Sequence, residues 1–337
     1  MFKRILCLTL CLCFPLLARA EVKRYSASFI DLFNTVTIIV GCDESISGFR
    51  ATAQQVHDEL EEYHQLYDIY HTYDGMNNLK TINDMAGIAP VQVDRRIIDL
   101  LLFCQDMHAR TNGLVDITMG SVLSLWHEAR VYGIDWPEEA YLPDDAALKE
   151  AALHTGFDKL IIDVEASTVF ITDPDMSLDV GAIGKGYAVE QICLQLPEGI
   201  MLSVGGNIRA TGVNPLTGNN WTAGVQNPEG SWNDYLHVLK VDGISVVTSG
   251  DYQRYYTVDG VRYGHIIDPR TLYPTGLWRA VCILVPDSGM ADALSTALYL
   301  LPVEEGQKLL DAFGAEALWI AQDGTQIFSP GFRNYIQ

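Results

Sequence analysis

The stretch Ser177–Glu190, SLDVGAIGKGYAVE, joins an apolar run to a group of glycines and a lysine. This order predicts a short strand, a glycine turn and a helix that begins near Tyr187. Backbone N–H groups and the positive end of that helix would then face an anion, and Lys185 would add a charge. The alternative is that the glycines only permit a tight turn and that Lys185 is solvated. The stretch alone does not decide between these interpretations.

The glycines of this stretch match neither of two common nucleotide-binding motifs. A P-loop needs four residues between its first glycine and a Gly-Lys pair that Ser or Thr follows, and Gly186 stands at that last position. The dinucleotide fingerprint Gly-x-Gly-x-x-Gly is absent, and the next glycine pair, Gly205–Gly206, does not fit it. A phosphate site here would therefore be of another kind.

The segments on either side of this stretch predict an α+β fold. Upstream, residues 29–40 predict a strand, or two strands joined at Asn34, residues 49–73 predict a helix, and residues 159–173 predict a hairpin. Downstream, short strands separated by glycine turns are followed by two helices and a closing strand pair. Strands and helices are grouped rather than strictly alternating, which is typical of α+β proteins.

The acidic, proline-bearing insert at residues 135–147 predicts a surface loop. It is not interpreted as a domain boundary, because strands and helices interleave on both sides and no linker rich in proline or serine appears. We therefore expect residues 21–337 to form one domain.

The first twenty residues predict an export signal. Lys3 and Arg4 give a positive start, residues 5–17 form an apolar run, and Ala18-Arg19-Ala20 fits a cleavage site. An uncleaved membrane anchor is the alternative, but a run of about 13 residues is shorter than the ~20 that span a bilayer. A lipid-modified cysteine is disfavoured by the residue before Cys13, which is not small. The expected location is the periplasm or another extracytoplasmic site, with membrane association left open.

The charge of the 337-residue chain limits its partners. Loss of residues 1–20 would change the net charge from −21 to −24, with 19 basic and 43 acidic residues remaining. Such a surface repels nucleic acid and anionic lipid, so we expect no nucleic-acid partner. An anionic substrate would need a local positive site or a metal ion. Cysteines 42, 104, 193 and 282 would remain, without a Cys-x-x-Cys pair, and free thiols are favoured over a disulfide.

A second candidate site combines residues 248–252, TSGDY, with residues 264–269, GHIIDP. His265 and Asp268 stand three residues apart beside a proline turn, where they can act as acid/base or ligand groups. Ser249 with this pair would suggest a hydrolase triad, but the chain has no Gly-x-Ser-x-Gly elbow. A histidine hydrogen-bonded within a turn is the alternative.

A third candidate site lies on the predicted helix that contains DALST. Asp292 and Thr296 are four residues apart, so both oxygens face the same side of the helix. Two hard oxygen ligands favour Mg²⁺ or Ca²⁺ over zinc. Taken alone, these residues are better explained by helix capping and by a bond from threonine to the preceding turn. Together, an anion turn, an acid/base group and a hard-metal site are the parts that phosphoryl transfer from a diphosphate needs.

The chain resembles the ApbE family, the FAD:protein FMN transferases, over essentially the whole length after the signal. The resemblance rests on DVGAIGKGYAVE, SVGGNI, TSGDYQRYY followed by GHIIDP, and DALSTAL, in that order. It implies a two-lobed, T-fold-like α+β enzyme domain with FAD between the lobes. It also implies Mg²⁺-dependent transfer of FMN from FAD to a threonine or serine of an exported or membrane flavoprotein subunit, with release of AMP.

The resemblance also implies site residues. Asp179 and Lys185 would contact FAD, while Ala182, through its carbonyl, Asp292 and Thr296 would bind Mg²⁺. Further FAD contacts would come from Phe33, Tyr73, Leu114, Val115, Asp116, His265 and Ile266.

Some of these positions depart from the pattern of the family. Phe33-Asn34 replaces the usual Met-Gly, and Val115 replaces a phenylalanine, which weakens individual flavin contacts. Tyr73 stands where tyrosine is linked with transfer and asparagine with FAD hydrolysis. His265, oriented by Asp268, is our hypothesis for the group that handles the hydroxyl proton. An FAD pyrophosphatase and an exported FAD-binding protein without turnover are the alternatives.

Overall fold

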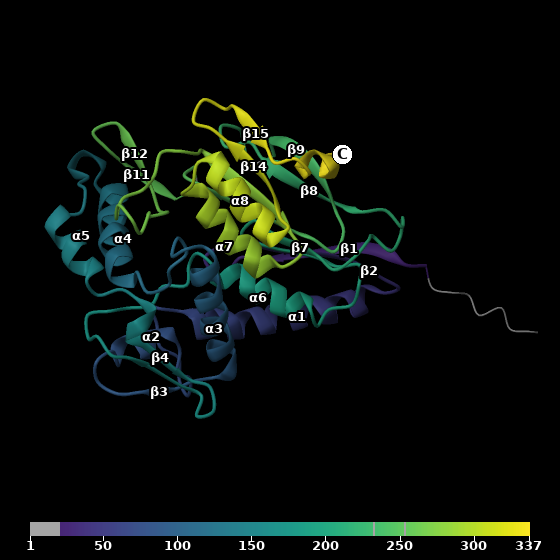
Figure 1. Cartoon of the computed structure of the whole chain (residues 1–337). Helices are drawn as coiled ribbons and strands as arrows, with labels where there is room; N and C mark the ends of the chain where they lie inside the picture. The colour runs from purple at the N-terminus through teal and green to yellow at the C-terminus, as the bar shows by residue number, and fades with distance from the viewer. Residues whose placement is uncertain (1–20, 232, 253) are drawn as a thin grey trace, which may run out of the picture.

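The chain folds around an eight-stranded antiparallel sheet in a computed structural model that describes residues 21–231, 233–252 and 254–337 (Figure 1). The predicted export signal, residues 1–20, lies outside the described residues. Across the sheet the strands are β1 (Lys23–Phe29), β2 (Thr37–Asp43), β6 (Met201–Val204), β7 (Asn207–Ala210), β10 (Ser245–Gly250), β13 (Ala280–Val285), β14 (Glu316–Ile320) and β15 (Gln326–Phe328).

Both faces of the sheet are covered, which explains why β13 reads AVCILV without polar residues. Side chains alternate between the faces of a strand, so Val281 and Ile283 pack in the larger core under the helices, whereas Cys282 packs in the opposite core. The helices of the larger core are α1 (Ile46–Tyr67), α6 (Gly184–Cys193), α7 (Ser288–Tyr299) and α8 (Val303–Phe313). The opposite face carries the hairpin β8 (Trp221–Gln226) and β9 (Tyr235–Val241), with η3 (Phe332–Tyr335).

A second group of elements extends from the helix-covered side (Figure 1). One part comprises α2 (Leu79–Asp84), α3 (Arg95–Arg110), η2 (Phe157–Lys159) and a small sheet of β3 (Val91–Gln92), β4 (Leu160–Asp163) and β5 (Thr168–Ile171). The other part comprises α4 (Gly120–Asp135), η1 (Pro137–Glu139), α5 (Asp145–Ala152) and the hairpin β11 (Tyr255–Val258) and β12 (Val261–Gly264). Trp126 of α4 packs in the core of this part and donates its indole N–H to the carbonyl of Leu272, 2.9 Å away.

The α+β class, the 159–173 hairpin and the loop character of most of the 135–147 insert are confirmed. The single strand predicted at residues 29–40 is wrong. β1 ends at Phe29, and β2 begins at Thr37 after a turn in which Phe33 and Asn34 have φ of 52° and 50°. The alternative of two strands is therefore confirmed, but residues 30–36, which include Asn34, separate them.

Two other element boundaries differ from those predicted. The helix predicted to reach residue 73 ends at Tyr67, because Asp68 is extended and accepts the backbone N–H groups of Tyr70 and His71. Residues 177–180 are not a strand, and α6 begins at Gly184 rather than near Tyr187. None of the described helices is long and apolar enough to span a membrane.

The four cysteines that lie among the described residues are free thiols, as expected. Cys104, Cys193 and Cys282 are buried, and Cys42 is half-buried.

Candidate active site

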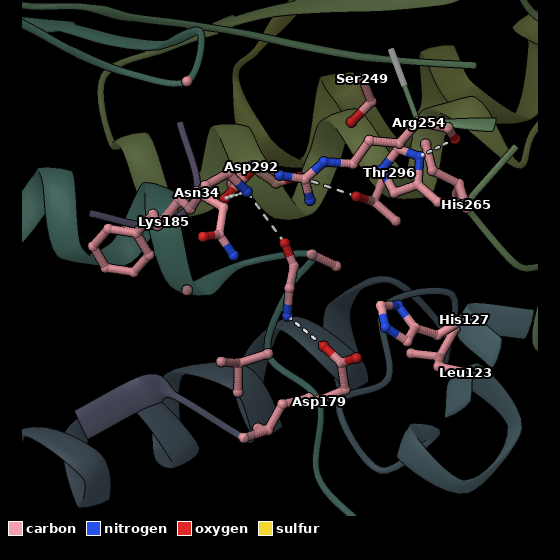
Figure 2. A pocket seen from close by; sticks show the side chains of 18 of the residues that line it. Asn34, Leu123, His127, Asp179, Lys185, Ser249, Arg254, His265, Asp292 and Thr296 are labelled. Atoms are coloured by element: carbon pink, nitrogen blue, oxygen red, sulfur yellow. Dashed lines mark hydrogen bonds and ion pairs between the residues drawn. The ribbon is translucent and has the colours of Figure 1, made fainter. Parts of the chain in front are cut away.

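A cavity of about 450 Å³ lies where the two groups of elements meet. Its wall is formed by the loop between β1 and β2, the segment after α1, helix α4, the turn before α6, the end of β10 and helix α7. Figure 2 shows polar side chains from these elements directed into the same space. Elements that are far apart in the chain therefore contribute to one site.

Asp292 is the most buried acidic group of the cavity, with 5% of its surface exposed. Its Oδ2 accepts the backbone N–H of Gly186 at 2.8 Å and lies 3.8 Å from the ammonium of Lys185. Burial raises the pKa of the Asp292 carboxyl, and the Lys185 charge and the Gly186 N–H only partly oppose that shift. Such a carboxylate would gain from a bound cation.

The packing around Gly186 explains why the opening stretch has a glycine at this position. A Cβ at this position would lie 2.3 Å from the carbonyl oxygen of Ser288 and 2.5 Å from the Cβ of Asp292. Glycine is therefore required for the close approach of α6 to α7. The N–H of Gly186 is one of the unpaired groups at the start of α6, and the anion that it binds is the carboxylate of Asp292. The Gly186 N–H at the helix start thus holds an internal anion.

The turn before α6 places Asp179, Ala182 and Lys185 in the cavity wall. Asp179 Oδ1 accepts the N–H of Gly181 at 2.8 Å, and Lys185 donates to the Gly181 carbonyl at 3.2 Å. Desolvation raises the pKa of Asp179. On α7, Thr296 also lines the cavity, and its hydroxyl donates to the backbone carbonyl of Asp292 at 3.4 Å. Asp292, Thr296 and Ala182, the three residues that the resemblance implies as metal ligands, thus line one cavity.

His265 lines the cavity opposite the α4 side chains. Its Nδ1 donates to the backbone carbonyl of Arg254 at 3.2 Å. Because a carbonyl only accepts, this contact assigns the proton to Nδ1 and leaves a lone pair on Nε2. Desolvation, together with the charges of Arg254, Arg130 and Lys185, lowers the pKa of His265 to about 3. The imidazole is neutral at physiological pH.

The predicted role of Asp268 as the group that orients His265 is wrong. Asp268 is buried, and its carboxylate binds the guanidinium of Arg270 at 2.7 Å and the backbone N–H of Arg270 at 2.9 Å. It does not line the cavity. The position of His265 is set by the Arg254 carbonyl, whereas Asp268 stabilises the turn that follows. Ser249 bonds Ser295 at 2.7 Å rather than His265, so the structure has no hydrolase triad here.

The remaining predicted FAD contacts divide into two groups. Five of them line the cavity: Phe33, Leu114, Val115, Asp116 and Ile266. Tyr73 does not line it, which corrects its predicted contact. Its hydroxyl donates to Asp68 Oδ2 at 2.8 Å, because the turn after α1 directs residues 68–71, rather than Tyr73, toward the cavity.

Three basic residues of the cavity wall were not among the predicted site residues: His127, Arg130 and Arg254. Arg130 Nη2 lies 3.0 Å from His127 Nδ1, and the His127 ring lies 5.6 Å from the ring of Tyr70. The i,i+3 spacing of His127 and Arg130 on a predicted helix was the available signal. The cavity thus combines a hard-oxygen cluster with several cationic groups, an arrangement suited to a phosphate ester with a divalent cation.

Comparisons with known proteins agree with this geometry. Residues 33–319 match the model of the ApbE family. The FAD:protein FMN transferase of Treponema pallidum is 33% identical over 329 residues, which cover 90% of this chain and 86% of that protein. The FAD:protein FMN transferase of Escherichia coli is 28% identical over 295 residues, covering 84% and 81%. The crystal structure of the ApbE protein of Thermotoga maritima matches with a TM-score of 0.81 and 28% identity, covering 94% of this chain and all of that one.

Proposed function

The chain belongs to the ApbE family, and from this premise we propose that it is an FAD:protein FMN transferase that flavinylates a serine or threonine of another protein. In this reaction the acceptor oxygen forms a bond to the phosphorus of the FMN half of FAD. The bond from that phosphorus to the bridging diphosphate oxygen breaks, and AMP leaves with that oxygen. The proton of the acceptor hydroxyl is removed.

The observation that carries the proposal is the pair Asp292 and Thr296 beside Lys185 in the cavity. A protein that only binds FAD does not require a buried carboxylate in a position suited to a cation. The donor set is oxygen only, which suits Mg²⁺ better than zinc. Asp292, Thr296 and the Ala182 carbonyl are therefore the residues that would hold it. When bound, Mg²⁺ would supply charge neutralisation for the diphosphate.

His265 is the group that we assign to the hydroxyl proton. It is neutral, and its Nε2 lone pair is available because Nδ1 donates to the Arg254 carbonyl. Bound diphosphate would favour the protonated imidazole, so the histidine would become more basic when substrate is present. In the variant His265→Asn, FAD binding should persist while transfer slows. Unchanged transfer would remove His265 from this role.

The substrate and its partner follow from the same assignment. FAD would lie between the two groups of elements, with its flavin near Phe33 and Val115 and its diphosphate near Lys185 and His265. The partner would be a flavoprotein, either an exported protein or a subunit of a membrane redox complex. With residues 1–20 removed on export, the enzyme would act in the periplasm or elsewhere outside the cytoplasm. Mass spectrometry of the N-terminus of the protein recovered from cells tests this location, since a signal-cleaved chain begins at Glu21.

The experiment that tests the function uses the chain without residues 1–20, FAD and an exported flavoprotein domain that carries an acceptor threonine. Flavin bound to the acceptor and AMP are measured together, with and without Mg²⁺. Equal amounts of both products, lost without Mg²⁺, are expected. AMP with free FMN would mean an FAD pyrophosphatase, and this outcome matters because Tyr73, the residue that disfavoured it, lies outside the cavity. FAD binding without either product would mean a binding protein.

A further inference from the structure

Two arginines of the cavity wall have no acidic partner among the residues that the structure describes. Arg209, Arg270 and Arg279, in other parts of the fold, each form an ion pair with a carboxylate at 3.3 Å or closer. Among the described residues, by contrast, no carboxylate oxygen lies within 4.0 Å of the guanidinium of Arg130 or Arg254. Within the described part of the chain, the side chain of Arg130 contacts the neutral ring of His127, 3.0 Å from Nη2 to Nδ1. In a chain with 43 acidic and 22 basic residues, two unpaired arginines in one cavity require a reason.

The two guanidiniums act on each other and on their surroundings. Burial lowers the pKa of Arg130, and the nearby charge of Arg254 lowers it further. Asp179 is the acidic group that acts in the opposite direction on Arg130, and its own oxygen is engaged by the Gly181 N–H. Like charges that are partly removed from water destabilise the empty site. A bound anion would turn this repulsion into attraction.

Arg130 and Arg254 line the same cavity as the residues that would hold Mg²⁺. Arg254 lies beside Thr296 and His265, and the α4 side chain of His127 faces them across the cavity (Figure 2). Lys185, by contrast, lies 3.8 Å from a carboxylate oxygen of Asp292 and donates to the Gly181 carbonyl. The charges of Arg254, Arg130 and Lys185 all act on His265. A diphosphate has two phosphorus centres, and the two arginines are cationic groups of the cavity in addition to Lys185.

We propose that Arg130 and Arg254 form a second anion subsite, which binds the phosphate that leaves with AMP. This inference rests on the proposed function, because it assigns one phosphate of the FAD diphosphate to the two arginines and the other to Lys185 and the metal-binding residues. When the bond between the FMN phosphorus and the bridging oxygen breaks, the AMP phosphate gains a negative charge. Guanidinium groups bind such a phosphate through short, charge-assisted hydrogen bonds. The subsite thus stabilises the leaving group and retains AMP after transfer.

The test compares two probes that differ only in the phosphate, AMP and adenosine. Their affinities for the chain lacking residues 1–20 are measured by calorimetry without metal. We expect AMP to bind more tightly than adenosine, and its affinity to fall as NaCl rises. Arg130→Met and Arg254→Met should each weaken AMP binding about tenfold or more, since each removes a charged hydrogen bond, and leave adenosine binding unchanged. Arg50→Met, an exposed arginine of α1 outside the cavity, is the matched control.

Equal affinities of AMP and adenosine for the wild-type chain would overturn the proposal. Unchanged AMP affinity in both methionine variants would also overturn it. If a methionine variant fails to fold, Arg130→Lys and Arg254→Lys are measured instead, because lysine keeps the positive charge but lacks the paired N–H donors of the guanidinium. Their AMP affinity should then be intermediate. Wild-type AMP affinity would count against the subsite. The proposed function is judged separately, because it fails if the wild-type chain forms no AMP from FAD, whatever its affinity for added AMP.

Discussion

Replacement of Gly186 by alanine tests how the opening stretch builds the site. The new methyl group would lie 2.3 Å from the backbone oxygen of Ser288, against at least 3.4 Å in ordinary contacts. A backbone oxygen inside a helix cannot rotate away, so α6 and α7 must separate by about 1 Å. That shift lengthens the Gly186–Asp292 hydrogen bond beyond its useful range. It also disturbs the bond in which Glu190 of α6 accepts the N–H of Ser288 at 2.8 Å.

The expected loss follows from these two effects. Overpacking a well-packed contact costs about 1–3 kcal/mol, and loss of a hydrogen bond to a buried carboxylate costs about 1.5–3 kcal/mol. We expect the free energy of unfolding of Gly186→Ala to fall by about 3–5 kcal/mol. For a domain of this size that change lowers Tm by roughly 5–8 °C. Because Asp292 moves with the contact, Mg²⁺ dependence of AMP formation should also shift to higher concentrations.

Thermal unfolding and a Mg²⁺ titration of AMP formation measure both effects. Gly276→Ala is the control, because a Cβ there meets no atom within 4 Å, and it should behave like the wild type. If Gly186→Ala keeps the wild-type Tm and Mg²⁺ dependence, then the glycine is not needed for packing. The alternative, in which the glycines only permit a tight turn and Lys185 is solvated, would then be favoured.

Three other changes test separate parts of the site. Asp292→Asn should abolish stabilisation by Mg²⁺ in thermal unfolding. Burial raises the folded pKa of Asp292, so the metal-free wild type should gain stability as pH falls toward 3.8. The variant should lack that gain. In ¹⁵N NMR the His265 ring should stay neutral from pH 8 to pH 4, since its pKa is about 3; a midpoint near 6.5 in the empty protein would contradict the cationic surroundings described above. Because the folded pKa of His265 is depressed, the stability that it contributes is present above pH 6.5 and is lost as pH falls toward 3, so His265→Asn should show a smaller acid-induced loss in denaturant titrations. Tyr73→Phe should cost about 1 kcal/mol of stability through its bond to Asp68 and leave FAD affinity unchanged in fluorescence titrations, whereas a large loss of FAD affinity would place Tyr73 at the cofactor after all.

Local sequence patterns predicted many residues of the site. Asp292 and Thr296 could be paired because residues four apart share a helix face whatever the fold around them. The turn and helix of the opening stretch, the hairpin at residues 159–173 and the α+β class also depend on residues within a few positions of one another. The glycines and Lys185 could be identified as a candidate anion site by the same local reasoning. The order of the motifs along the chain then indicated the family.

Other features depended on contacts between residues distant in the chain. Gly186 and Asp292 are 106 positions apart, and only the packing of α6 on α7 makes the glycine a spacer and the carboxylate its ligand. His265 is oriented by a backbone carbonyl, a group that every residue type possesses, so no side-chain pattern could identify it. Arg130 and Arg254 come from α4 and from the segment before β11, and only the topology brings these two cationic groups into one cavity. Short-range propensity determines where helices, turns and strands form. The electrostatic potential and the packing at the site depend instead on residues that only the tertiary structure brings into contact.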